Sequence, residues 1–193
     1  LLLDALTDAG YPGLAYQLLL NTSYPSWLYP VTRGATTIWE RWDGIRPDGS
    51  FQDPGMNSFN HYAYGAVGNW LYSRVAGIQS DLQSAGYKKI IIRPVISPPL
   101  THACATYQSM YGEITSGWEV NGTKLILRVT IPANATAQIH IPASCEAAVT
   151  EHGIPIEKSG ELENKGTSGG CRVVECGSGI YHFETCLPSD DKT

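Results

Sequence analysis

The stretch Gly86-Tyr87-Lys88-Lys89-Ile90-Ile91-Ile92-Arg93-Pro94 marks the point where the 193-residue sequence changes character. Its centre is a β-branched isoleucine run, which predicts a strand. The residues before it are rich in Leu, Ala, Tyr and Trp at helical spacing, whereas short apolar runs separated by Gly, Pro and Asn follow it. We therefore predict an α and β chain in two parts, with helices over 1–86, an antiparallel β-sandwich over 87–187 and a tail at 188–193.

Apolar spacing and end signals predict several helices in the first part. Two form a pair, one around Leu1 to Leu6 and one over 14–20, with a Pro-Gly turn between them. Thr36 and Thr37 could cap a third helix, which would carry the tryptophans that follow. A fourth should start at Asn57 or Ser58 and run to about Val75, where Gly77 ends it.

The second part offers short strand candidates at the spacing that is typical of an antiparallel sandwich. Those after the isoleucine run are 125–131, 137–141, 171–175 and 179–184. The Pro-rich stretch 95–104 is expected to be a crossing loop.

Composition excludes several classes of function. The formal charge of −5 gives no basic surface for nucleic acid. No apolar run reaches the ~18–20 residues of a membrane span, so no membrane partner is expected. Because the sequence starts at Leu1 without Met, inside an expected helix, we expect further chain upstream.

The five cysteines are an odd number without a CxxC pair, which argues against a disulfide framework. A bridge between Cys171 and Cys176 stays open. None of the histidines has ligand spacing to another, so neither a metal nor another cofactor is expected. His140 and His182 fall in strand candidates, and His102 and His152 in loops.

The segment Thr36-Thr37-Ile38-Trp39-Glu40-Arg41-Trp42-Asp43-Gly44 places a carboxylate between two tryptophans. Sugars have apolar C–H faces and polar edges, so aromatic faces beside a carboxylate suit them. The alternative is a packing helix that buries Trp39 and Trp42, with Glu40 paired to Arg41 or capping the helix.

A second polar cluster, Asn57-Ser58-Phe59-Asn60-His61-Tyr62-Ala63-Tyr64-Gly65, leads into the last expected helix. A histidine at a helix N-terminus is disfavoured in its charged form by the helix dipole. A neutral His61 could then donate a hydrogen bond to a sugar hydroxyl. The alternative is that His61 only caps or packs locally.

Together these stretches resemble the bacterial inverting α-L-rhamnosidases. The resemblance spans nearly the whole chain, and its motifs occur in the family's order. Besides the two clusters and the isoleucine run, it covers 29–31, 34–40, 129–134 and 177–183.

The resemblance implies that residues 1–86 are the last helical hairpins of an incomplete (α/α)6 barrel, followed by the family's C-terminal β-sandwich. It gives Glu40 the role of general base and places His61 at the rhamnose. Trp39 and Trp42 would pack against the sugar. The family's general acid lies on an earlier segment, absent here, so the resemblance implies little activity for this chain alone. The expected partners are a rhamnose-containing glycan and the upstream part of the same enzyme.

Two other functions stay open at this point. The sandwich could be a carbohydrate-binding module with Trp118, Tyr107 and Tyr111 as its platform, or it could only stabilise the barrel. Other glycosidases also use the helical barrel, so the fold alone does not select rhamnose. The cellular location is undetermined: a periplasmic or secreted parent fits, and so does a cytoplasmic one.

Overall fold

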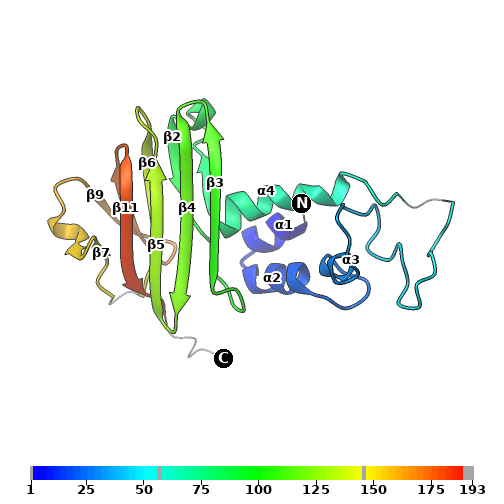
Figure 1. Ribbon diagram of the computed structural model, residues 1–193. Coiled ribbons are helices and arrows are strands. Elements are labelled where there is room, and N and C mark those ends of the chain that lie inside the picture. Colours follow the sequence, from blue (N-terminus) through cyan, green and yellow to red (C-terminus); the bar gives the residue numbers. More distant parts are fainter. Residues whose placement is uncertain (1, 56–57, 145–146, 189–193) are drawn as a thin grey trace. The chain divides into compact units, whose positions relative to one another are not determined.

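The computed structural model describes residues 2–55, 58–144 and 147–188 (Figure 1). It divides into two compact units, residues 1–70 and 71–193. The predicted domain boundary near residue 86 stays a prediction, but residues 71–86 lie with the sandwich unit. No helix in the described ranges is long and apolar enough to cross a membrane. Leu1, Asn57, Cys145 and the tail from residue 189 lie outside the described residues.

The first unit is built on short helices. Helices α1 (Leu2–Asp8) and α2 (Pro12–Leu20) form the predicted pair, with Pro12 in the first turn of α2. Helix α3 (Leu28–Thr32) lies in the Pro-rich stretch after them. The 3-10 helix η1 (Ala63–Ala66) leads into α4 (Val67–Trp70).

A buried aromatic pair holds this unit together. Trp70 is 1 % exposed and lies edge-on to Tyr16, with 5.1 Å between ring centroids. Its indole Nε1 donates to Thr7 Oγ1 at 3.0 Å, so its one polar atom is satisfied. Burial of the phenol raises the pKa of Tyr16. The pair therefore fixes α4 against α1 and α2.

The prediction of a helix after Thr36 is wrong, because residues 35–44 form no regular secondary structure. Their backbone groups bind another segment of the chain: the N–H of Glu40 donates to the carbonyl of Ser58 at 2.8 Å, and that of His61 to Ile38 at 2.8 Å. The Thr37 hydroxyl also donates to the carbonyl of Phe59. The last helical stretch accordingly begins at Ala63 and not at Ser58.

The sandwich unit contains two sheets, which lie face to face (Figure 1). A five-stranded sheet has the order β1-β2-β6-β10-β9, and a six-stranded sheet has the order β3-β4-β5-β11-β7-β8. The strands of the first are β1 Ile78–Ser80, β2 Lys89–Ile92, β6 Thr136–Pro142, β10 Cys171–Cys176 and β9 Glu163–Ser168. Those of the second are β3 His102–Ser109, β4 Gly112–Asn121, β5 Lys124–Ile131, β11 Gly179–Cys186, β7 Thr150–Glu151 and β8 Ile154–Pro155. The helical turns of this unit are η2 Leu71–Val75, η3 Ala85–Tyr87 and η4 Ile156–Lys158.

The strands β2, β5, β6, β10 and β11 confirm the predicted ones. Among the strands of the described residues, all pairings are antiparallel except that of β2 with β6, which is parallel. Residues 102–104, predicted as loop, belong to β3, which pairs along its whole length with β4. His102 is therefore in a strand.

The core lies between the sheets. Side chains of β5 alternate, so that Leu125, Leu127, Val129 and Ile131 are at most 3 % exposed while their neighbours face outward. A fully buried aliphatic side chain contributes about 1.5–3 kcal/mol relative to an exposed one. Burial of these side chains therefore stabilises the sandwich.

The last residue of η2 and the residue after it accept hydrogen bonds from side chains of β4. Trp118 Nε1 donates to the carbonyl of Val75 at 2.7 Å, and Ser116 Oγ to that of Ala76 at 2.6 Å. Gly77 follows with φ +82°, and a Cβ there would lie 2.3 Å from the nitrogen of Pro94. The glycine predicted to end the helix is thus required by a close backbone approach as well.

Two alternatives that the sequence left open for this unit are excluded. Trp118 is 2 % exposed, so it is a core residue and not part of a sugar platform. Cys171 and Cys176 are free thiols at the two ends of β10, so the disulfide left open between them does not form. Burial raises the pKa of Cys176 to about 11, which leaves it protonated at neutral pH.

Candidate active site

The two polar clusters of the sequence lie side by side in the first unit. The backbone bonds that join 38–40 to 58–61 bring Glu40 and His61 onto one pair of adjacent segments. Neither segment is a helix or a strand, so their positions depend on these bonds and on the aromatic residues around them. Binding and catalytic residues commonly lie on such irregular segments.

Glu40 is held by its neighbour's backbone. Its Oε2 accepts a hydrogen bond from the N–H of Ser58 at 2.9 Å, while its own N–H donates to the Ser58 carbonyl. The residue is half-buried, and the bond from Ser58 orients its carboxylate. Helix capping by Glu40 is excluded because residues 35–44 contain no helix, and the guanidinium of Arg41 is bonded to Asp43 at 3.0 Å.

His61 lies just before the first turn of η1. Its Nδ1 accepts a hydrogen bond from the N–H of Ala63 at 3.2 Å, so in this arrangement the proton of the neutral ring is on Nε2. The ring stacks on Tyr62, with centroids 5.1 Å apart. The local capping considered for His61 is therefore present, and its Nε2–H remains a donor that a ligand could use.

The two tryptophans have different surroundings. Trp39 is 7 % exposed and lies edge-on to Phe59 at 5.2 Å. Trp42 is half-buried and stacks on Tyr64 at 4.9 Å. Trp27, which the sequence did not single out, lies 4.6 Å from Trp42. Trp39 is thus a buried residue that packs against Phe59. Trp42 belongs to a cluster of three rings with Trp27 and Tyr64, and it is partly exposed.

The remaining acids of this region have structural partners. Asp48 and Asp53 accept hydrogen bonds from the backbone of Ser50 and Gly55, both at 2.9 Å, as expected for turn-forming residues. The bonds from Ser50 hold the pKa of Asp48 below its usual value. Asp43 accepts two hydrogen bonds from the guanidinium of Arg41, at 3.0 and 3.1 Å.

Within the described ranges, no group of three or more His, Cys, Asp or Glu side chains could hold a metal ion. The adjacent segments carry an oriented carboxylate, an imidazole and aromatic rings, which are side chains that enzymes acting on sugars use.

Comparison with known proteins agrees with that class. Residues 1–75 match the model of the bacterial alpha-L-rhamnosidase 6 hairpin glycosidase domain, and residues 77–154 match that of the bacterial alpha-L-rhamnosidase C-terminal domain. The chain therefore belongs to the bacterial α-L-rhamnosidase family.

An α-L-rhamnosidase of Streptomyces avermitilis is 43 % identical over 183 residues, which cover 94 % of this chain and 17 % of the relative. One of Formosa agariphila is 50 % identical over 142 residues, covering 74 % of this chain and 15 % of that protein. A crystal structure of the Streptomyces avermitilis enzyme complexed with L-rhamnose superposes with a TM-score of 0.84 at 42 % identity, over 95 % of this chain and 17 % of that one. The chain thus spans less than a fifth of the length of these relatives.

Proposed function

We propose that this chain is the C-terminal part of a glycoside hydrolase that removes terminal α-L-rhamnosyl residues with inversion at the anomeric carbon. Its relatives are α-L-rhamnosidases, and one of them is described in complex with L-rhamnose. The observation that carries the proposal is Glu40, a half-exposed carboxylate that the Ser58 N–H holds in one orientation.

In this reaction Glu40 acts as the general base. It takes a proton from a water molecule, whose oxygen then attacks the anomeric carbon from the face opposite the leaving group. A general acid protonates the glycosidic oxygen as that bond breaks, and the two carboxyl groups of such a pair stand roughly 6.5–9.5 Å apart. We place that acid on the upstream part of the enzyme, so the isolated chain is expected to hydrolyse little or nothing.

His61 and Trp42 would hold the sugar. The Nε2–H of His61 can donate to a rhamnose hydroxyl, because Nδ1 is already occupied by the N–H of Ala63. The exposed part of Trp42 offers an aromatic surface to the methyl group and the C–H face of the deoxy sugar. The buried Trp39 would act by supporting this loop through Phe59.

The test is hydrolysis of an aryl α-L-rhamnoside by the intact enzyme that carries this chain, with the product anomer followed by NMR. Glu40→Gln should lower kcat by about 10²–10⁴-fold, the range that general base catalysis contributes. Asp48→Asn is the matched control, since that carboxylate accepts only turn hydrogen bonds. Near-normal activity in Glu40→Gln, or a product that retains its anomeric configuration, would contradict the proposal.

A further inference from the structure

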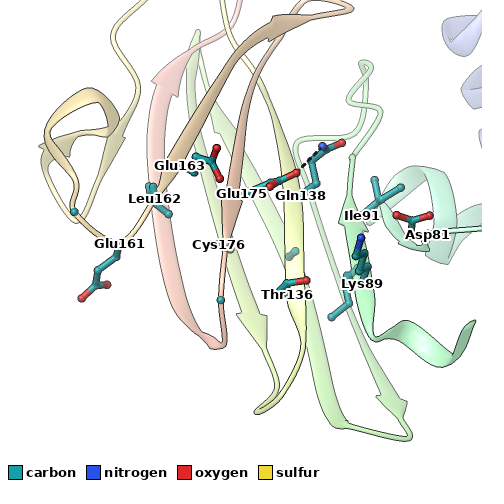
Figure 2. Close-up of a pocket in the computed structure, with 14 residues that line it drawn as sticks. Asp81, Lys89, Ile91, Thr136, Gln138, Glu161, Leu162, Glu163, Glu175 and Cys176 are labelled. Carbon is teal, nitrogen blue, oxygen red and sulfur yellow. Dashed lines mark hydrogen bonds between the residues drawn. The ribbon is translucent and has the colours of Figure 1, made fainter. Parts of the chain in front are cut away.

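A groove of about 550 Å³ crosses the outer face of the five-stranded sheet, within the sandwich unit (Figure 2). Alternation in the strands explains which side chains reach it. In β2, Ile90 and Ile92 are buried in the core, so Lys89 and Ile91 point the opposite way. The volume lies within the ~300–1,000 Å³ that is usual for small-molecule sites.

The floor and walls of the groove come from different elements. Gln138 of β6 and Glu175 of β10 point toward one another across the floor, and Lys89 and Ile91 lie on the next strand (Figure 2). Asp81, just after β1, lies beyond them on one side, and the segment 160–163 lies on the other (Figure 2).

A chain of hydrogen bonds fixes the polar groups of the floor. Gln138 Oε1 lies 2.9 Å from His140 Nε2, and Gln138 Nε2 donates to Glu175 Oε1 at 3.4 Å. The ammonium of Lys165 then joins Glu175 at 3.1 Å to Glu163 at 2.7 Å. His140, at one end of this row of hydrogen bonds, is only 8 % exposed and therefore has little freedom to move. Groups that are oriented in advance lose less entropy when a ligand binds.

The charges in the groove are only partly balanced, with four carboxylates against two ammoniums. Its carboxylates are Asp81, Glu161, Glu163 and Glu175. Lys165 neutralises the last two in part, and Lys89 adds a second ammonium on the floor. Since none of these acids belongs to a metal-binding group in the part of the chain that the structure describes, the groove offers separate hydrogen-bonding groups and no cation cage.

Apolar side chains lie among these polar ones. Ile91 is half-buried on the floor, and Leu162 is 8 % exposed at the wall. Carboxylates, an amide and an ammonium around small apolar patches are complementary to a ring that has hydroxyls on its edge and C–H groups on its face. The remaining net negative charge disfavours a uronic acid or another anion.

We propose that this groove is a second carbohydrate-binding site, which is built from the sandwich unit alone and holds a neutral sugar unit of a glycan chain. The choice of a rhamnose-bearing glycan as its ligand rests on the proposed function, whereas the choice of a neutral sugar rests on the groove itself.

The experiment is a titration of the full chain carrying Glu40→Gln, which slows any hydrolysis, with a neutral rhamnose-containing oligosaccharide. Binding is measured by calorimetry and located by amide chemical shifts. Chemical-shift changes are expected on β2, β6 and β10.

Thr136→Trp fills the groove from an exposed position and should weaken binding at this site by about tenfold or more, while the milder Glu161→Gln should weaken it by about threefold. Glu113→Gln on β4 is the matched control and should change nothing.

Circular dichroism of each variant checks its fold, and Glu161→Gln keeps the test decisive if Thr136→Trp does not fold. Shifts confined to 38–61, or affinity unchanged by the groove variants, would overturn the proposal. Tighter binding of a uronic-acid oligosaccharide of equal length, or displacement of the sugar by spermidine, would overturn the neutral-sugar assignment. Binding of a neutral oligosaccharide without rhamnose, but not of the rhamnose-containing one, would support the groove and count against the proposed function.

Discussion

The helical unit and the sandwich unit position their important residues by different means. In the sandwich, strand ladders and alternating apolar side chains fix each residue, as for Leu125 to Ile131 of β5. In the helical unit, the segments 35–44 and 58–62 have no regular structure, and a few side-chain and backbone bonds place Glu40 and His61. The comparison indicates that substitutions in the sandwich core should change stability, whereas those in the helical unit's loops should change activity.

Trp118→Ala should have the largest effect on stability. The side chain is 2 % exposed, and its indole is bonded to the carbonyl of Val75. Removing a buried tryptophan costs about 3–5 kcal/mol. Urea unfolding of the sandwich should report this loss, with Trp118→Phe in between, because it keeps one aromatic ring but loses the second ring and the N–H donor. The partly exposed Tyr111→Ala is the control, and an equal loss there would contradict the assignment of Trp118 to the core.

His61→Ala should lower kcat/KM of the intact enzyme by about 10–100-fold, which is about 1.4–2.7 kcal/mol. His61→Asn separates the two roles of this side chain, because the asparagine Oδ1 can still accept from the N–H of Ala63. If the imidazole contacts rhamnose, the Asn variant stays impaired, mainly in KM. Recovery of activity in the Asn variant would show that His61 serves only as a cap.

Ser116→Ala should destabilise the sandwich by about 1–2 kcal/mol, since the Ala76 carbonyl loses a buried hydrogen-bond partner. Chemical denaturation measures it, and the exposed Ser178→Ala is the control. The activity of the intact enzyme at saturating substrate should be unaltered. A large change in kcat without a change in stability would contradict the division between the two units.

The smallest effect is expected at the exposed pair of Lys124 and Glu184, which are 2.8 Å apart. Lys124 holds the pKa of the Glu184 carboxyl below its usual value. The pair should therefore stabilise the fold above the unfolded pKa of glutamate, about 4.3, and this contribution should disappear as the pH falls through the lower folded value. The free energies of unfolding of Lys124→Gln and of the unaltered chain should differ slightly at pH 7 and become equal at pH 2. A difference in the free energy of unfolding that grows as the pH falls would contradict this prediction.

Regular patterns made parts of this fold predictable. The alternation in β5 and the isoleucine run of β2 mark buried strands that the structure confirms. Strand β3 was missed because its residues are small or polar and mostly exposed at the edge of its sheet. The predicted helix at 36–42 failed because local capping signals say nothing about Ser58 and His61, whose backbone groups bind that segment.

The candidate site was predictable only in part. Residue types singled out Glu40 and His61, and the structure places their segments together. The Ser58 N–H that holds the carboxylate could not be found from the sequence, because every residue except proline has the same donor. Trp27 carried no signal either, since its contact with Trp42 depends on the folded loop.

The parallel pairing of β2 with β6 also affects how the chain folds while it is being synthesised. Strand β2 can pair with β1 as soon as both have left the ribosome, but its other edge is closed by Thr136–Ile139, which emerge only after β3, β4 and β5. During that interval Ile90–Ile92 form an open apolar edge, the kind of surface that recruits other chains. Lys88 and Lys89 precede this run, and their charges oppose stacking between nascent chains.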